Sequence, residues 1–309
     1  MFFTPERLSF ERDGKNWPHR QHSRFVRAYG LSWHVQEMGE GELTLVLIHG
    51  TGASTHSWRA LMDLLSPHAR VIAFDLPGQG FTDRFDDADP TLPTMAAAVG
   101  ALLQELALEK PVLIGHSAGA AVSLQVALDG AVDVQSVISI NGALYPFPGA
   151  ASSIFPMLAK LLFLNPFMPH LFAMGAGGKH RVERLLDGTG STLDDEGLSL
   201  YQTLFKNPSH VRATLAWMAN WNLVPLVQAM ANFDKPFLQI IGAEDRTIEP
   251  GNAYETEQRI KGAKTIMVPK LGHLVHEEAP EPVAKHILDF ISARQSDEPL
   301  RDRATGSFF

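Results

Sequence analysis

The sequence of 309 residues contains no cysteine and no uninterrupted apolar run of about 18 residues. The first absence excludes disulfides, thiolate nucleophiles, iron–sulfur clusters and cysteine-ligated zinc. The second argues against a membrane span, because five prolines divide the most apolar stretch, residues 144–174. The N-terminus also lacks a basic start followed by an apolar core, so we expect no secretory signal and a cytoplasmic location.

Positive charge is also scarce. Lysine and arginine number 26 against 34 aspartates and glutamates, which gives a formal net charge of −8. This balance argues against a broad nucleic-acid interface and against a surface steered to anionic lipid. The composition, 45% hydrophobic and 19% charged, is that of an ordinary globular protein large enough to bury its own core.

Short apolar runs alternate with helical patterns along most of the chain, after an expected hairpin over residues 23–39. Strands are expected at 43–48, 70–74, 111–114, 134–140, 236–241 and 265–268, and helices at 57–65, 94–108, 120–128, 252–260 and 280–293. Continuous apolar strands alternating with helices predict an α/β fold whose parallel sheet is covered on both faces.

The alternation stops between residues 143 and 231, where leucine, phenylalanine, methionine and proline are frequent. We therefore predict a helical cap, residues 143–231, inserted into a core formed by residues 1–142 and 232–309. The aromatic side chains of the cap are candidates to line an apolar substrate pocket: Phe147, Phe155, Phe163, Trp217 and Trp221. Ordinary core packing is the alternative for these residues.

A possible nucleophile lies in the sequence Gly115-His116-Ser117-Ala118-Gly119, between an expected strand and an expected helix. A serine on such a tight turn takes a strained conformation, and its neighbours must lack bulk. The helix N-terminus behind it favours a developing negative charge. We predict Ser117 as the nucleophile, with Gly115, His116 and Gly119 forming the turn; a tight turn with an incidental serine is the alternative.

A serine hydroxyl needs a base, and the base needs an acid to orient it. His273 follows the last expected strand and Asp245 follows the preceding one, which gives the chain order serine, aspartate, histidine. His276 is the alternative base and Glu244 the alternative acid. Asn141 occupies another place where such folds put the acid, but asparagine carries no charge, which favours Asp245.

Acyl chemistry also requires N–H donors for the oxyanion. The Ala118 N–H, just after the nucleophile, is one candidate. The Thr51 N–H, in the sequence His49-Gly50-Thr51-Gly52 at the end of an early strand, is the other. For the His49 side chain we predict a structural role, bracing this loop.

Two other chemistries fit less well. Residues 50–55 followed by Asp75 imitate a dinucleotide-binding fingerprint, but threonine stands at position 55 where the third glycine belongs. His273 and His276 hint at a metal site without the His-Glu-x-x-His pattern. We therefore predict neither a cofactor nor a metal.

Together these motifs resemble the α/β-hydrolase superfamily. The resemblance rests on residues 49–52, 75–80, 115–119, 242–245 and 272–273 and extends from residue 24 to residue 293. It implies a mostly parallel eight-stranded sheet, a cap after the sixth strand and no required cofactor. Serine as nucleophile sets the chain apart from haloalkane dehalogenases and epoxide hydrolases, which use aspartate there.

A narrower resemblance lies in residues 16–20, 23–26, 33–36 and 50–58. These segments are similar to the BchO family, the magnesium-chelatase accessory proteins of bacteriochlorophyll biosynthesis in phototrophic bacteria. The resemblance implies a tetrapyrrole pathway, magnesium-chelatase subunits as partners, a link to photosynthesis and a position near photosynthetic membranes.

The leading hypothesis is a serine hydrolase acting on an ester in a bulky apolar substrate, such as a tetrapyrrole-pathway compound. The alternative is a non-catalytic accessory or tetrapyrrole-binding protein that supports magnesium chelatase. A third hypothesis applies the same triad to C–C cleavage or lyase chemistry, because fold and triad do not fix the reaction.

Overall fold

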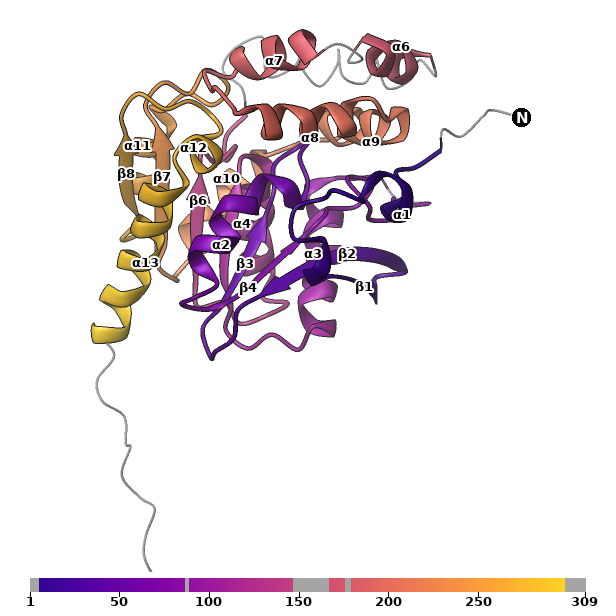
Figure 1. Ribbon diagram of the computed structural model, residues 1–309. Helices are drawn as coiled ribbons and strands as arrows, with labels where there is room; N and C mark the ends of the chain where they lie inside the picture. Colours follow the sequence, from indigo (N-terminus) through magenta and orange to yellow (C-terminus); the bar gives the residue numbers. More distant parts are fainter. Residues whose placement is uncertain (1–5, 87–88, 147–166, 176–178, 298–309) are drawn as a thin grey trace, which may run out of the picture.

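The computed structural model describes residues 6–86, 89–146, 167–175 and 179–297. One eight-stranded sheet forms its centre, in the order β1-β2-β4-β3-β5-β6-β7-β8 (Figure 1). The pairs β1–β2 and β2–β4 are antiparallel and all others are parallel. The strands are β1 Ser23–Ala28, β2 Leu31–Met38, β3 Thr44–Ile48, β4 Arg70–Phe74, β5 Val112–His116, β6 Ser136–Ile140, β7 Phe237–Gly242 and β8 Lys264–Val268.

The central strands form because their apolar runs bury side chains on both faces. Every residue of β3, β5 and β6 is buried, as expected for parallel strands covered on both sides. Helices α3 (Leu92–Glu105) and α4 (Ala118–Asp129) contribute to the core on one face. Helices α2 (Arg59–Leu65) and α13 (Pro280–Asp297) contribute to the core on the other. The predicted α/β sheet is therefore confirmed.

The opening hairpin, expected over residues 23–39, is present and turns at Tyr29 and Gly30. Both residues have positive φ, 54° and 74°, the conformation that a two-residue hairpin turn requires. The smaller remaining elements are α1 Phe10–Asp13, α11 Asn252–Arg259, α12 Val275–Glu278 and 3-10 turns at Arg20–His22, Thr55–Trp58 and Met230–Asn232.

The described residues between β6 and β7 form five α-helices, which we call the cap: α6 Met168–Gly175, α7 Lys179–Asp187, α8 Asp195–Phe205, α9 Pro208–Ala219 and α10 Val224–Ala229. Figure 1 shows α6 to α9 as a layer over one end of the sheet. Side-chain caps fix two of these helices, since Asp194 accepts a hydrogen bond from the Gly197 N–H and Asn207 from the His210 N–H.

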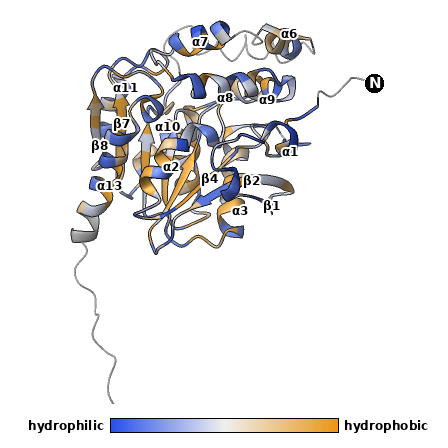
Figure 2. Ribbon diagram, in the orientation of Figure 1, coloured by the Kyte–Doolittle hydropathy of each residue, from blue (hydrophilic) through white to orange (hydrophobic). Residues whose placement is uncertain are grey.

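Figure 2 shows the apolar residues concentrated in the strands, while the cap helices carry mixed faces. Within the described ranges, no helix is both long and apolar enough to span a bilayer. The parallel strands end below the cap, and ligand sites of open α/β sheets lie at such carboxyl ends. The layer between sheet and cap is therefore the place to look for a site.

Candidate active site

Ser117 lies on a sharp turn between β5 and α4. Its backbone has φ 52° and ψ −120°, outside the regions that non-glycine residues prefer. A Cβ on Gly115 would collide with the Gly119 carbonyl, and one on Gly119 would collide with the Ile48 carbonyl. The glycines flanking the serine are therefore required by the close backbone approach, and the strained turn presents Ser117 to the space above the sheet.

His273 and Asp245 form a buried pair at the ends of neighbouring strands. The His273 Nδ1 lies 2.8 Å from the Asp245 Oδ2. The other carboxylate oxygen, Oδ1, accepts hydrogen bonds from the N–H groups of Thr247 (2.7 Å) and Ile248 (2.9 Å). With a carboxylate at Nδ1, the proton of the neutral imidazole belongs on that nitrogen, which leaves Nε2 as the basic atom.

Asn141 supports this acid instead of replacing it. Its Nδ2 donates to the Asp245 Oδ2 at 2.6 Å, and its Oδ1 accepts from the Gly242 N–H at 3.3 Å. Its φ of 44° places it in the left-handed region that asparagine tolerates. The sequence predicts Asn141 only as an alternative position for the acid, and its support of Asp245 is visible only in the structure.

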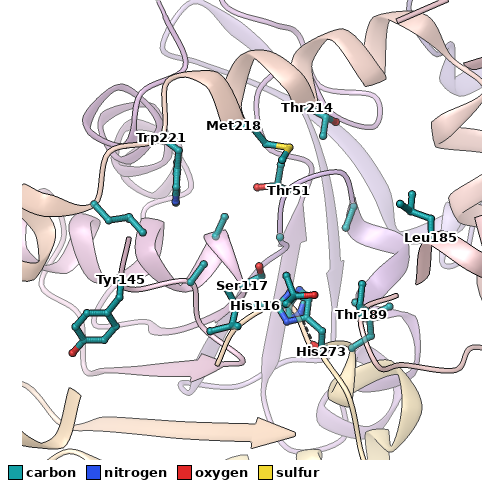
Figure 3. A pocket seen from close by; sticks show the side chains of 18 of the residues that line it. Thr51, His116, Ser117, Tyr145, Leu185, Thr189, Thr214, Met218, Trp221 and His273 are labelled. Atoms are coloured by element: carbon teal, nitrogen blue, oxygen red, sulfur yellow. Dashed lines mark hydrogen bonds between the residues drawn. The ribbon is translucent and has the colours of Figure 1, made fainter. Parts of the chain in front are cut away.

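Ser117 and His273 both line one cavity (Figure 3). Within the described ranges no hydrogen bond joins the Ser117 Oγ to His273; such contacts often tighten only when substrate binds. The alternative base, His276, is fully buried, and the centre of its ring lies 4.3 Å from that of His116, with the two ring planes tilted by 41°. The alternative acid, Glu244, is exposed. The structure thus brings the predicted histidine and aspartate together and places the two alternatives elsewhere.

The loop that carries Thr51 lies directly against the nucleophile. A Cβ on Gly50 would come 3.0 Å from the Ser117 Cβ, so glycine is needed for this approach. Ala118 begins α4, where N–H groups precede the helical ladder. In the described part of the chain, neither the Thr51 N–H nor the Ala118 N–H has a hydrogen-bond acceptor. The His49 ring braces the loop, since its Nε2 accepts from the Leu76 N–H at 2.9 Å.

The cavity measures about 530 Å³, and its described walls come from core and cap. No aspartate, glutamate, lysine or arginine is among them. Besides Ser117, His116, His273 and the Thr51 loop, the described lining residues include Tyr145, Leu185, Leu186, Tyr201, Phe205, Thr214, Met218, Trp221, Leu223, Val224 and Ile248. The described part of the wall therefore surrounds the serine with mostly apolar side chains and carries no lysine, arginine, aspartate or glutamate.

The five aromatic residues predicted to line the pocket lie in different places. Trp221 lines the cavity. The prediction for Trp217 is wrong, because this side chain does not form part of the described wall. It is completely buried in the hydrophobic core, and its ring lies edge-on to that of Trp221 with 5.2 Å between the ring centres. Phe147, Phe155 and Phe163 lie outside the described residues. Thr214 and Met218 line the cavity but were not predicted to do so. Their spacing of four residues places them on one face of α9, and this spacing is visible in the sequence.

His116 connects the turn that carries Ser117 to the loop after β8, which carries His273. Its Nε2 donates to the His273 carbonyl at 2.9 Å. A second buried connection reaches the cap, where the Glu277 carboxylate pairs with Arg59 at 2.6 Å and accepts from the Tyr201 hydroxyl at 2.8 Å. Burial raises the pKa of Glu277 to about 7, and Arg59 opposes that rise. Both connections hold the loop after β8 in place.

Asp75, the acid of the dinucleotide-like pattern, is engaged by neighbouring residues of the core. The Asp75 carboxylate accepts hydrogen bonds from the Thr55 N–H (2.7 Å) and the Phe81 N–H (2.8 Å) and pairs with His34 (2.8 Å). It is completely buried, so it organises the core and has no face for a ribose. Across the described ranges, no group of three or more histidine, aspartate or glutamate side chains has the arrangement of a metal site.

Neither ring nitrogen of His276 has a hydrogen-bond partner within the described residues. Burial lowers the pKa of His276 to about 3. In the unfolded chain this imidazole binds a proton near pH 6.5, whereas in the folded chain it stays neutral until the pH is much lower. The free energy of unfolding therefore decreases as the pH falls below 6.5. We expect His276→Phe to reduce the loss of unfolding free energy between pH 7.5 and 5.5 by about 1 kcal/mol.

Urea unfolding at both pH values measures this effect. His68→Gln is the control, because His68 is exposed and its replacement should leave the pH dependence unchanged. An identical pH dependence in wild type and His276→Phe would contradict the argument.

The fold and the geometry at Ser117 define the class. The model of the family described as alpha/beta hydrolase fold matches residues 44–280. The chain therefore belongs to the alpha/beta hydrolase family. A putative lipase from Acinetobacter baumannii superposes with a TM-score of 0.77 at 21% identity, covering 96% of this chain and 99% of that one, and this likeness supports the fold.

More specific likeness comes from sequence. The magnesium-chelatase 30 kDa subunit of Rhodobacter capsulatus is 37% identical over 277 residues, covering 89% of this chain and 96% of that protein. This match confirms the predicted resemblance to the magnesium-chelatase accessory family. An uncharacterized hydrolase, YugF, of Bacillus subtilis is 26% identical over 259 residues, covering 81% of this chain and 90% of that protein.

Proposed function

We propose that the protein is a serine hydrolase that cleaves ester bonds in bulky, uncharged, apolar substrates. The observation that carries the proposal is the buried His273–Asp245 pair, which opens on the same cavity as a serine on a strained strand-to-helix turn. A hydroxyl, an oriented base and an apolar chamber are the parts that nucleophilic acyl transfer requires.

The steps follow from this arrangement. The Ser117 Oγ attacks the ester carbonyl while the His273 Nε2 takes its proton, and Asp245 stabilises the imidazolium. The Thr51 and Ala118 N–H groups stabilise the oxyanion. His273 then protonates the departing alcohol, and water attacks the acyl-serine by the same route to release the acid.

The lack of charged side chains in the described wall predicts that the protein prefers uncharged esters to anionic ones. A carboxylate carried into this chamber would lose its hydration without gaining a counter-ion among the described lining residues. We expect kcat/KM for p-nitrophenyl pentanoate to exceed that for mono-p-nitrophenyl glutarate, which has the same chain length and a terminal carboxylate, by about 100-fold.

The measurement is initial-rate kinetics with both esters at pH 7.5. Met218 lies on the cavity wall, and Met218→Arg supplies the missing counter-ion. We expect this variant to narrow the ratio mainly by raising kcat/KM for the anionic ester. Equal kcat/KM values for the two esters in the wild-type enzyme would contradict the assignment of an uncharged substrate.

A second candidate function is supported by the 37% identical relative named as a magnesium-chelatase subunit. In this alternative the protein is an accessory or tetrapyrrole-binding module that works with magnesium-chelatase subunits, and the cavity holds the macrocycle without turnover. Titration with a porphyrin dimethyl ester distinguishes the two. Tight binding by wild type and Ser117→Ala alike, with no hydrolysis of any ester, would favour the accessory function.

A further inference from the structure

Cap helix α9 lies directly on two turns of the core beside the nucleophile. A Cβ on Gly78 would come 2.8 Å from the Ala213 Cβ of the helix. A Cβ on Gly52, in the loop that carries Thr51, would come 3.5 Å from the Thr214 Cγ2. Both glycines have positive φ, 79° and 81°, so the turns themselves also favour glycine. Glycine at position 78 thus leaves room for α9, and a side chain at position 52 would meet the helix at ordinary contact distance.

His210, in the first turn of α9, forms a hydrogen bond with each ring nitrogen. Its Nε2 lies 3.1 Å from the Gly52 carbonyl oxygen, and its Nδ1 lies 3.2 Å from the Gly80 backbone nitrogen. A carbonyl only accepts and a backbone N–H only donates, so Nε2 carries the proton and Nδ1 accepts. The residue is 2% exposed, and both of its ring nitrogens have a hydrogen-bond partner.

The two bonds of Gly52 come from different parts of the molecule. Its N–H donates to the Gln79 Oε1 at 2.7 Å, within the core, and its carbonyl accepts from His210, within the cap. A glycine backbone can adopt more conformations than that of any other residue. These two hydrogen bonds therefore restrict the loop at a position that would otherwise be flexible. Gly52 directly follows Thr51, whose N–H is the proposed oxyanion donor.

The protonation state of His210 allows both of its hydrogen bonds to persist at neutral pH. Burial lowers the pKa of His210 to about 4, so the ring is neutral near pH 7. A neutral ring can hold both bonds at once, whereas a protonated ring would lose the acceptor that the Gly80 N–H requires.

We propose that His210 positions the oxyanion loop, Gly50–Ala53, so that the cap holds the Thr51 N–H in its catalytic place. The inference rests on the proposed function and deepens it. His210 is a positioning residue, since it acts through the backbone of Gly52. Transition-state stabilisation depends steeply on where an oxyanion donor lies, so a displaced loop lowers kcat more than it raises KM.

Three variants of His210 and one control test the proposal. His210→Phe keeps the ring volume and removes both hydrogen bonds, and we expect kcat for p-nitrophenyl pentanoate to fall by about ten- to a hundredfold with KM changed less than about threefold. His210→Asn retains an acceptor near Nδ1 but does not reach Gly52, and should resemble His210→Phe. His210→Gln retains a donor near Nε2 and should recover most of kcat.

The control is Val211→Ala, which removes apolar bulk from the adjacent buried residue of the same helix. It is expected to lower the unfolding midpoint while leaving kcat within twofold. Hydrogen–deuterium exchange of the peptide covering residues 49–54 is the second readout. We expect faster exchange in His210→Phe than in wild type and an unchanged rate in Val211→Ala.

The two readouts separate the possible failures. If wild type hydrolyses the ester and His210→Phe retains its kcat, or if exchange in residues 49–54 is unchanged, His210 has no positioning role. If wild type hydrolyses no ester, the proposed function fails, and the exchange measurement alone decides whether His210 restrains the loop.

Discussion

Replacing Ser117 by alanine is expected to lower kcat/KM for p-nitrophenyl pentanoate by at least about ten-thousandfold. The change removes the oxygen that attacks the ester in the proposed mechanism, while the turn should persist because its shape depends on Gly115 and Gly119. Residual activity would come from the oxyanion donors and the cavity alone. Initial-rate kinetics with an active-site-independent protein assay measure the effect.

Ser199→Ala is the matched control, because Ser199 is an exposed serine on cap helix α8. Its activity should equal that of wild type. Retention of more than a tenth of the wild-type kcat/KM by Ser117→Ala would contradict the assignment of the nucleophile.

Asp245→Asn should be nearly as damaging, and the reason lies in its hydrogen bonds. The Thr247 and Ile248 N–H groups both point at one carboxylate oxygen, so the amide oxygen of asparagine would take that position. The amide NH₂ would then face His273, which would have to accept at Nδ1 and carry its proton on Nε2. A histidine in that tautomer cannot take the proton from Ser117. We expect kcat to fall by about 10⁴-fold.

Steady-state kinetics of Asp245→Asn measure this loss, with KM expected to change little. Glu244→Gln is the control, because the Glu244 side chain is exposed beside the acid, and it should keep wild-type kcat. A kcat for Asp245→Asn within tenfold of wild type would show that Asp245 does not set the tautomer of the base.

Local backbone chemistry explains which parts of this site could be predicted from sequence. A strained serine requires glycines two residues to either side, and the bulk that Gly115 and Gly119 must lack is visible in the sequence itself. The alternation of apolar runs and helices determines which residues end the strands, and this brought Asp245 and His273 to one edge of the sheet. Such signals depend on neighbours only a few positions away.

The features missed by the sequence analysis depend on distant partners. His210 bonds a glycine 158 positions earlier in the chain, and no local pattern in α9 marks it out. Asn141 was not predicted as a site residue because it carries no charge. In the structure it supports the site through the hydrogen bond that its Nδ2 donates to Asp245. Trp217 and Trp221 are equally aromatic and four residues apart, but α9 ends at Ala219, so helical spacing does not tell which of them lines the cavity.

Covalent labelling by a fluorophosphonate, with the modified residue located by peptide mass spectrometry, tests the central claim most directly. Such a reagent reacts with an activated serine whatever the natural substrate is. The account predicts a single adduct on Ser117 in the wild-type protein, no adduct in Ser117→Ala, and strongly slowed labelling in Asp245→Asn. A folded wild-type protein that takes up no label, or takes it up at another residue, would contradict the serine-hydrolase assignment and leave the accessory function as the better explanation.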